Sequence, residues 1–227
     1  LNVMASSGFS TLLNRPTVLN ADQFRQALAF YTPEDQSGDF GGSVNAFDAI
    51  TRTAATQNYA LDVSGGNDDA KYRISAGYLD QNGIVETSRL RKFTTNLNSN
   101  FKFLESKKLG LDINILASQT DENIVPINVG VGFEGNVISQ ALQWNPTLPL
   151  RDDKGALTYQ SPTLINPLTS LAAFKDRAVV NTILSSISPS YKITDDLEYK
   201  LMYSLPRQTG RRTGRLIAGM INPNDIN

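Results

Sequence analysis

The sequence contains no cysteine and no histidine. Disulfides, thiolate nucleophiles, imidazole general bases and the commonest transition-metal ligands are therefore absent together. The chain also lacks any run of about 18 consecutive apolar residues, which excludes a helical membrane span, so a membrane role would have to be built from strands. These absences exclude most familiar catalytic constellations, and we expect neither an enzyme nor a bound cofactor or metal.

Charge of one sign is also lacking. The 21 basic and 22 acidic residues give a net charge of −1, so no global field gathers phosphate backbones and nucleic acid is not an expected partner. Residues 1–10 have neither the basic start nor the apolar stretch of a signal peptide, and the first residue is not Met. We interpret the chain as mature or as cut from a longer one.

What the sequence does contain is alternation of apolar and polar residues with period two, the pattern of a strand with two different faces. Five stretches show it clearly: 59–64, 71–78, 93–103, 109–118 and 197–205. A sixth, roughly 180–193, is interrupted by Pro189, which would remove a ladder hydrogen bond. In the third stretch one face is wholly polar, with Asn96, Asn98 and Asn100 on it.

The connections between these stretches alternate in length. They are short at 65–70, 104–108 and 194–196, medium at about 80–92, and very long at about 119–178. Short turns at one end and long loops at the other are typical of outer-membrane barrels. A soluble sandwich also alternates faces, but a loop of about 60 residues counts against it.

The fold class that we predict is all-β: an antiparallel meander of hairpins forming part of a transmembrane β-barrel, with long extracellular loops that contain short helices. Residues 1–57 are expected to be a loop region with a helix capped by Asn20, residues 58–207 to be the barrel hairpins, and residues 208–227 to begin a further loop. The excursion at about 119–178 should lie at the end of the sheet opposite the short turns.

Two runs, QNYALDVSGGN at 57–67 and KYRISAGYLDQNGIV at 71–85, resemble the barrel of SusC/RagA-family TonB-dependent transporters. Shorter runs extend the resemblance over nearly the whole chain: VLNADQF at 18–24, ITRTA at 50–54, NPTLP at 145–149, NPL at 166–168 and YKITDDL at 191–197. The chain departs from the family at Ala46-Phe47, where the family often has Asp-Trp.

The resemblance implies an outer-membrane location in a bacterial cell and contact with outer-membrane lipid. It also implies uptake of glycans or peptides together with a SusD-like surface lipoprotein, energised by TonB. A plug domain and a TonB-contacting segment are features of the family, and neither is visible in these 227 residues. An internal part of a barrel, without the plug, is the expectation.

Candidate binding residues are few. Trp144 and Tyr159 lie in the long loop, where an aromatic face could stack on a sugar ring, although ordinary loop packing would explain them as well. Acidic pairs at 68–69, 152–153 and 195–196 could hold calcium, but each has the chemistry of a turn.

One basic cluster could contact lipopolysaccharide phosphates or an acidic substrate, or could be a solvated loop. It consists of Arg207, Arg211, Arg212 and Arg215. Two other functions stay open at this point: a secreted carbohydrate-binding β-sandwich and a hydrolase that uses two carboxylates.

Overall fold

The computed structural model describes residues 1–104, 106–127, 136–161 and 163–217. Its strands are β1 (Asn2–Ser10), β2 (Ala54–Gly66), β3 (Ala70–Asn82), β4 (Arg89–Phe103), β5 (Leu109–Ile124), β6 (Phe174–Lys192), β7 (Glu198–Lys200) and β8 (Tyr203–Leu216). Its helices are α1 (Ala21–Tyr31), α2 (Ala46–Ala49), α3 (Val137–Gln143) and α4 (Pro167–Ala173). None of the helices in these ranges is long and apolar enough to cross a membrane.

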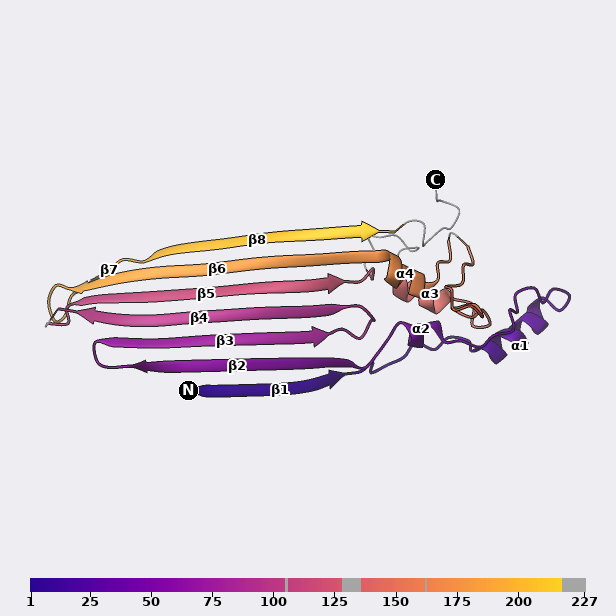
Figure 1. The fold of residues 1–227 in the computed structure, drawn as a ribbon, viewed down its shortest axis with the longest axis horizontal. Helices are drawn as coiled ribbons and strands as arrows, with labels where there is room; N and C mark the ends of the chain where they lie inside the picture. The colour runs from indigo at the N-terminus through magenta and orange to yellow at the C-terminus, as the bar shows by residue number, and fades with distance from the viewer. Residues whose placement is uncertain (105, 128–135, 162, 218–227) are drawn as a thin grey trace.

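The strands form one antiparallel sheet in which neighbours in the chain are neighbours in space, from β1 to β7, with β8 paired to β6. Figure 1 shows the short turns at one end of this sheet and the helices with the long connections at the other. The predicted meander is confirmed, and so is the placement of the long excursion opposite the short turns. A β-sandwich needs a second sheet over the first, and the described residues form only this one.

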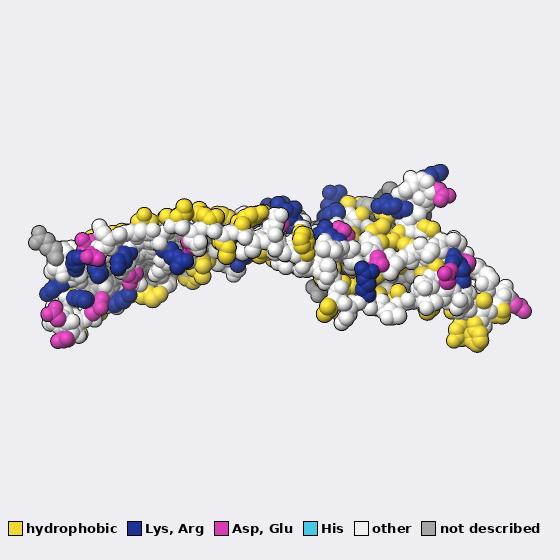
Figure 2. Space-filling view, turned by 90° about the horizontal axis from the view of Figure 1, so that it is seen from below, with side chains coloured by type: hydrophobic (Ala, Val, Ile, Leu, Met, Phe, Trp, Pro, Cys, Tyr) yellow, Lys and Arg dark blue, Asp and Glu magenta, His cyan; other side chains and the backbone are white. Residues whose placement is uncertain are grey.

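Register places most of the apolar side chains of the strands on the same face of the sheet; Leu116 and Leu184, which pair with each other on the opposite face, are exceptions. Leu61 pairs with Ala76, Ile74 pairs with Leu97, and Leu97 pairs with Ile115. We call this the apolar face, and the opposite one the polar face. Figure 2 shows hydrophobic side chains along one side of the curved sheet, and Lys, Arg, Asp and Glu gathered in a hollow at the end away from the helices.

Strands extend further than the alternation predicts at both ends of the chain. Residues 2–10, expected in a loop region, form β1 and pair with β2, and residues 203–216 form β8 although 208–227 were expected to be loop. β5 and β6 are also longer, so the excursion spans only 125–173. For β8 and the end of β5 the reason is physical: beyond the apolar band both faces of a strand are polar, and period two is no longer visible in the sequence.

The predicted strand at 197–205 is interrupted. β7 and β8 pair with the two parts of β6, and the ladder opens near Pro189, which has no N–H to donate. The Leu201 N–H still donates to the Pro189 carbonyl at 3.0 Å. β7 and β8 are thus two parts of one edge of the sheet, divided by a proline in the neighbouring strand.

Helix α1 begins where the sequence predicts. The side chain of Asn20 accepts from the Gln23 N–H at 2.9 Å, and the Gln23 side chain accepts from the Asn20 N–H at 3.0 Å, which completes a capping box. The helix runs to Tyr31.

Candidate functional site

The polar face of the sheet is lined by side chains that can donate and accept hydrogen bonds. One row crosses the strands in register and contains Ser64, Arg73, Asn98, Asn114, Ser186 and Ser204. Asn114 Nδ2 donates to Ser186 Oγ at 3.4 Å, and Arg73 pairs with Asp62 at 2.9 Å. Such a surface can exchange hydrogen bonds with water or with a polar solute.

A hollow of about 540 Å³ lies on this face towards the short turns. Lys71 and Arg73 line one side of it and Lys200 the other, with Asp112 between them. Asp112 accepts from Asn100 Nδ2 at 2.5 Å and forms an ion pair with Lys200 at 2.7 Å. Because Arg73 is paired with Asp62, Lys71 is the one cation lining this hollow for which the described residues supply no ion-pair partner, and the Asp112 carboxylate is already matched.

The helices at the other end of the sheet pack into a small hydrophobic core, which we call the loop cluster. It joins segments far apart in sequence: Ala46, Phe47 and Ile50 from α2 and its end, Val125, Val137, Ala141, Trp144, Leu148 and Leu150 from the excursion, and Leu171 from α4. Ile50 and Val137 have 0% exposure. Asn45, Asn136 and Asn166 cap the three helices, since each side chain accepts backbone N–H groups of the first turn.

The two aromatic candidates lie in different environments. Trp144 is 4% exposed, and its Nε1 donates to the Leu148 carbonyl at 2.8 Å. Tyr159 is 40% exposed. Trp144 also borders a cavity of about 740 Å³ between the start of α1, the start of α2 and the end of α3, whose lining residues do not include Tyr159. The tryptophan has the environment of a core residue, whereas the tyrosine has a free surface.

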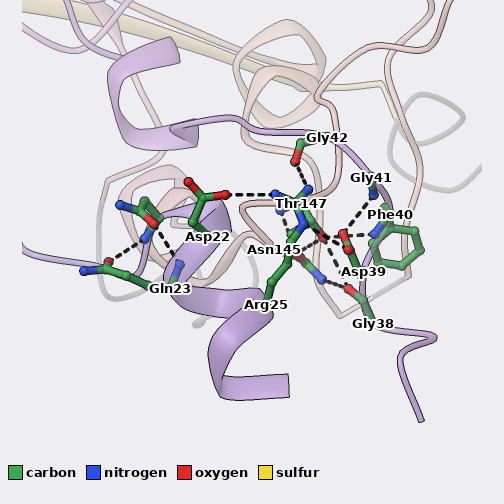
Figure 3. A network of polar contacts seen from close by, with 11 residues as sticks. Asp22, Gln23, Arg25, Gly38, Asp39, Phe40, Gly41, Gly42, Asn145 and Thr147 are labelled. Carbon is green, nitrogen blue, oxygen red and sulfur yellow. Dashed lines mark hydrogen bonds and ion pairs between the residues drawn. The ribbon is translucent and has the colours of Figure 1, made fainter. Parts of the chain in front are cut away.

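A polar network fastens the α1 segment to the excursion, as Figure 3 shows. Arg25 pairs with Asp39 at 2.9 Å and donates to the Gly42 carbonyl at 2.7 Å. The Gly42 N–H in turn donates to the Thr147 carbonyl at 2.7 Å, and Asn145 Nδ2 donates to the Gly38 carbonyl at 2.8 Å. A Cβ added at Gly42 would lie 2.7 Å from the Thr147 oxygen, so this close approach requires glycine.

The same network shifts two ionisation equilibria. The hydrogen bond from Arg25 holds the pKa of Asp39 below its ordinary value, and the N–H of Gly41 adds to this effect. The hydrogen bond with Asp39 raises the pKa of Arg25. Both groups therefore stay charged at neutral pH and hold the segment in place.

The sequence run at 50–54 also has a structural role. Arg52 donates to the carbonyls of Gly83 and Ser88 at 3.1 Å and 2.9 Å, and it pairs with Glu86 at 3.0 Å. One guanidinium thus closes the connection between β3 and β4 against the start of β2. Sequence reasoning did not find this role, nor the network around Arg25.

The acidic pair at 152–153 is placed in a turn. Asp152 accepts from the N–H groups of Lys154 and Ala156 at 3.0 Å and 2.8 Å. In the described parts of the chain no three acidic side chains gather in a way that could hold a metal ion. Of the four arginines of the basic cluster, Arg212 pairs with Asp176 on the polar face, while the odd-numbered members lie on the opposite face of β8.

A sheet with one apolar and one polar face, short turns at one end and long loops at the other is the arrangement typical of the wall of an outer-membrane β-barrel. No family model matches the sequence. TonB-dependent receptor P3 of Formosa agariphila is 27% identical over 205 residues, which are 89% of this chain and 20% of the receptor. TonB-dependent receptor SusC of Bacteroides thetaiotaomicron is 27% identical over 213 residues, 82% of this chain and 20% of SusC.

Among solved structures, the RagAB peptide transporter superposes with a TM-score of 0.74 at 16% identity, covering 93% of this chain and 28% of the other. The open-open state of the RagAB peptide importer gives a TM-score of 0.73 at 15% identity, covering 93% of this chain and 28% of the other. The chain is therefore related to the TonB-dependent receptors of the SusC/RagA class, and it spans about a fifth of the length of the relatives that it matches.

Proposed function

We propose that this chain forms part of the barrel wall of a TonB-dependent outer-membrane transporter that imports glycans or peptides together with a SusD-like surface lipoprotein. The observation that carries the proposal is the opposition of the two faces of the sheet. Apolar side chains such as Phe93, Ile115 and Ile187 are 36% to 49% exposed on one face, with no second layer over them among the described residues. Lipid is the solvent that such a face fits.

The dimensions of the strands support the same assignment. A tilted strand needs about 9 to 11 residues to cross the hydrocarbon core. The apolar positions of β5 run from Leu109 to Ala117, and the strand continues to Ile124 with Asp121, Glu122 and Asn123. The apolar part of this strand matches the bilayer, and the charged end extends beyond it on the side of the helices.

The mechanism proposed for the polar face is passage along hydrogen-bonding side chains, without covalent chemistry. One row across the strands contains Asn98, Asn114 and Ser186. A polar solute that passes along this row can replace the water molecules bound to these side chains, one hydrogen bond at a time. Glycans and peptides both present dense donors and acceptors, so both fit such a row. RagAB is described as a peptide transporter, which favours peptides, while the resemblance to SusC leaves glycans open.

The loop cluster lies at the end of the sheet that we assign to the cell exterior, where a SusD-like lipoprotein would dock. Its buried core and the network around Arg25 make it a preformed surface. In the excursion that contributes to it, Tyr159 is the proposed stacking residue for substrate because its ring is accessible, and Trp144 is proposed to support the loop that carries Tyr159.

The test uses the full-length protein that contains this segment. A deletion strain, and the same strain complemented with the full-length gene, would be given fluorescent oligosaccharides and fluorescent peptides, with and without a protonophore that collapses the energy source of TonB. We expect one substrate class to be taken up only by the complemented strain, only without protonophore, and the protein to fractionate with the outer membrane. Uptake that is unchanged by deletion, or a protein recovered outside the membrane fraction, would contradict the proposal.

Tyr159→Ala and Trp144→Ala separate the two aromatic roles in the same assay. Loss of the tyrosine ring should raise the substrate concentration needed for half-maximal uptake while the protein level in the membrane stays the same. Loss of the tryptophan should lower the amount of folded protein. Equal effects of the two variants on uptake per folded molecule would contradict the proposed division of roles.

A further inference from the structure

The boundary of the apolar face on the side of the helices shifts from strand to strand. On β2, β3 and β4 the last large apolar side chains are Tyr59, Tyr78 and Phe93, which lie in one cross-strand row. On β5 the boundary lies one row nearer the short turns, at Ala117. On β6 the large apolar side chains reach the same row at Ile183, and Asn181 and then Val179 follow on the same face. On β8 the boundary lies a further row in the same direction, at Leu205. A boundary that drifts across the strands in this way is expected of strands tilted in a bilayer.

Basic side chains lie beyond this boundary on the same face, directly after Leu205 on β8 and after Asn181 and Val179 on β6. Arg207 and Arg211 follow Leu205 on β8, and Arg177 and Lys175 lie beyond Ile183 on β6. Arg215 is the cross-strand partner of Lys175. We call the outward-facing set Lys175, Arg177, Arg211 and Arg215 the basic patch; all four side chains line a hollow of about 670 Å³ and belong to exposed residues.

The acidic side chains near the basic patch are already matched. Asp121 pairs with Arg91 at 2.8 Å and with Arg177 at 2.7 Å. Asp176, the one carboxylate that lines the hollow, is held by Arg212. Among the described residues Lys175, Arg211 and Arg215 have no ion-pair partner.

We propose that the basic patch binds the phosphate-bearing headgroup of an outer-leaflet glycolipid. Lys175 and Arg215 face each other across the ladder, so their side chains start about 5 Å apart and can hold one phosphate between them. Arg211 lies four residues from Arg215 on the same face, about 13 Å along the strand, and is placed for a second anionic group. This site rests on the proposed function, because it assigns the apolar face to lipid.

Its position identifies a lipid rather than a soluble anion as the occupant. The patch lies on the same face as Ile183 and Leu205, both more than 40% exposed, and Val179, the cross-strand partner of Arg211, is the apolar side chain between Ile183 and Arg177. A ligand with acyl chains would cover these side chains while its phosphate reaches the cations, so a single molecule satisfies both parts of the surface. A free phosphate would bind only the basic patch and would leave the apolar side chains uncovered.

The test measures binding to the purified full-length protein in neutral detergent by native mass spectrometry. The probes are lipid A with its phosphates, lipid A from which the phosphates have been removed, and inorganic phosphate as a competitor. We expect the phosphorylated lipid to bind about tenfold more tightly than the dephosphorylated one, and inorganic phosphate at equal concentration not to displace it.

The variant Lys175→Gln/Arg215→Gln should remove that preference, and Arg215→Lys should retain part of it because the charge remains while the bidentate contact is lost. The matched control is Lys71→Gln/Lys102→Gln, which removes two exposed charges from the polar face and should leave lipid binding unchanged. Equal binding of the two lipids, an equal loss in the control variant, or full displacement by inorganic phosphate would overturn the proposal.

Failure of this inference can be separated from failure of the proposed function. A protein that assembles in the outer membrane and supports uptake, but shows no preference for phosphorylated lipid, overturns the lipid site alone. A protein that does not reach the outer membrane overturns both.

Discussion

The sheet and the loop cluster keep their apolar side chains in different places. In the loop cluster, Ile50 and Val137 have 0% exposure, and the three Asn-capped helices close over them as in a small soluble domain. In the sheet, Leu61, Ile74 and Ile115 stay more than a third exposed on a face that carries no second layer among the described residues. Under the proposed function the two regions face different solvents: water around the loop cluster, and lipid against the apolar face of the sheet.

This difference decides what each substitution should do. A core residue of the loop cluster contributes by excluding water and filling space, so its loss is local and large. A residue on the apolar face contributes by matching the bilayer, so its effect depends on which face it lies on rather than on burial within the chain.

The largest expected effect is that of Trp144→Ala. Removing the buried indole and its hydrogen bond to Leu148 should destabilise the loop cluster by about 3–5 kcal/mol. Hydrogen exchange of the full-length protein would show faster exchange in the excursion and α4 and unchanged exchange in the sheet. Tyr159→Ala is the control with little expected change, and faster exchange throughout the sheet would contradict the separation of the two regions.

The next largest effect is expected from placing an arginine on the apolar face of a strand, and it is measured against the same substitution on the polar face. Ile115→Arg places a charge near the middle of the apolar run and should cost about 2–4 kcal/mol of folding in a bilayer, whereas Asn114→Arg points to the polar face and should cost much less. Urea titration of the full-length protein folded into lipid vesicles gives both values. Equal costs for the neighbouring positions would mean that the two faces do not see different solvents.

Gly42→Ala tests the fastening of the α1 segment. The added Cβ would meet the Thr147 carbonyl at 2.7 Å and Pro149 Cγ at 2.8 Å, and we expect about 1–3 kcal/mol of local destabilisation. Limited proteolysis between residues 32 and 42 would report the loosened segment. Gly8→Ala in β1, where a Cβ would meet nothing within 4 Å, is the matched control, and cleavage that rises equally in both variants would count against the argument.

The smallest expected effect is the pH dependence of the contacts that hold the α1 segment against the excursion. The pKa of Asp39 is lower in the folded chain than in the unfolded one, so its contribution to stability is complete above the unfolded value of about 3.9 and is lost as pH falls through the folded pKa. Cleavage of the α1 segment by an acid protease should therefore rise steeply at the lowest pH. Asp39→Asn should cleave more readily at neutral pH and show a flatter pH dependence; an unchanged profile would contradict this role of Asp39.

Much of the sheet could be predicted because alternation is local information. The faces of β3, β4 and β5 follow from residues two positions apart, and the short turns fix which strands are neighbours. The prediction failed where charge replaces alternation, as in β8, where Arg211 and Arg215 lie on a strand that reads as a loop. Short helices were predicted in the long loops, but the positions of α2 to α4 were not, although Asn45, Asn136 and Asn166 carry the capping signal, with Pro167 after the last of them.

The sequence by itself determined which side chains of each strand face the same way, because a strand turns every second residue to one side whatever surrounds it. Only the tertiary structure decided that Trp144 is a core residue and Tyr159 a surface residue, since the core around Trp144 joins Ile50 to Leu171 across 121 positions of sequence. The basic patch is of the same kind: Lys175 and Arg215 are forty positions apart in the chain, and only the pairing of β6 with β8 makes them neighbours.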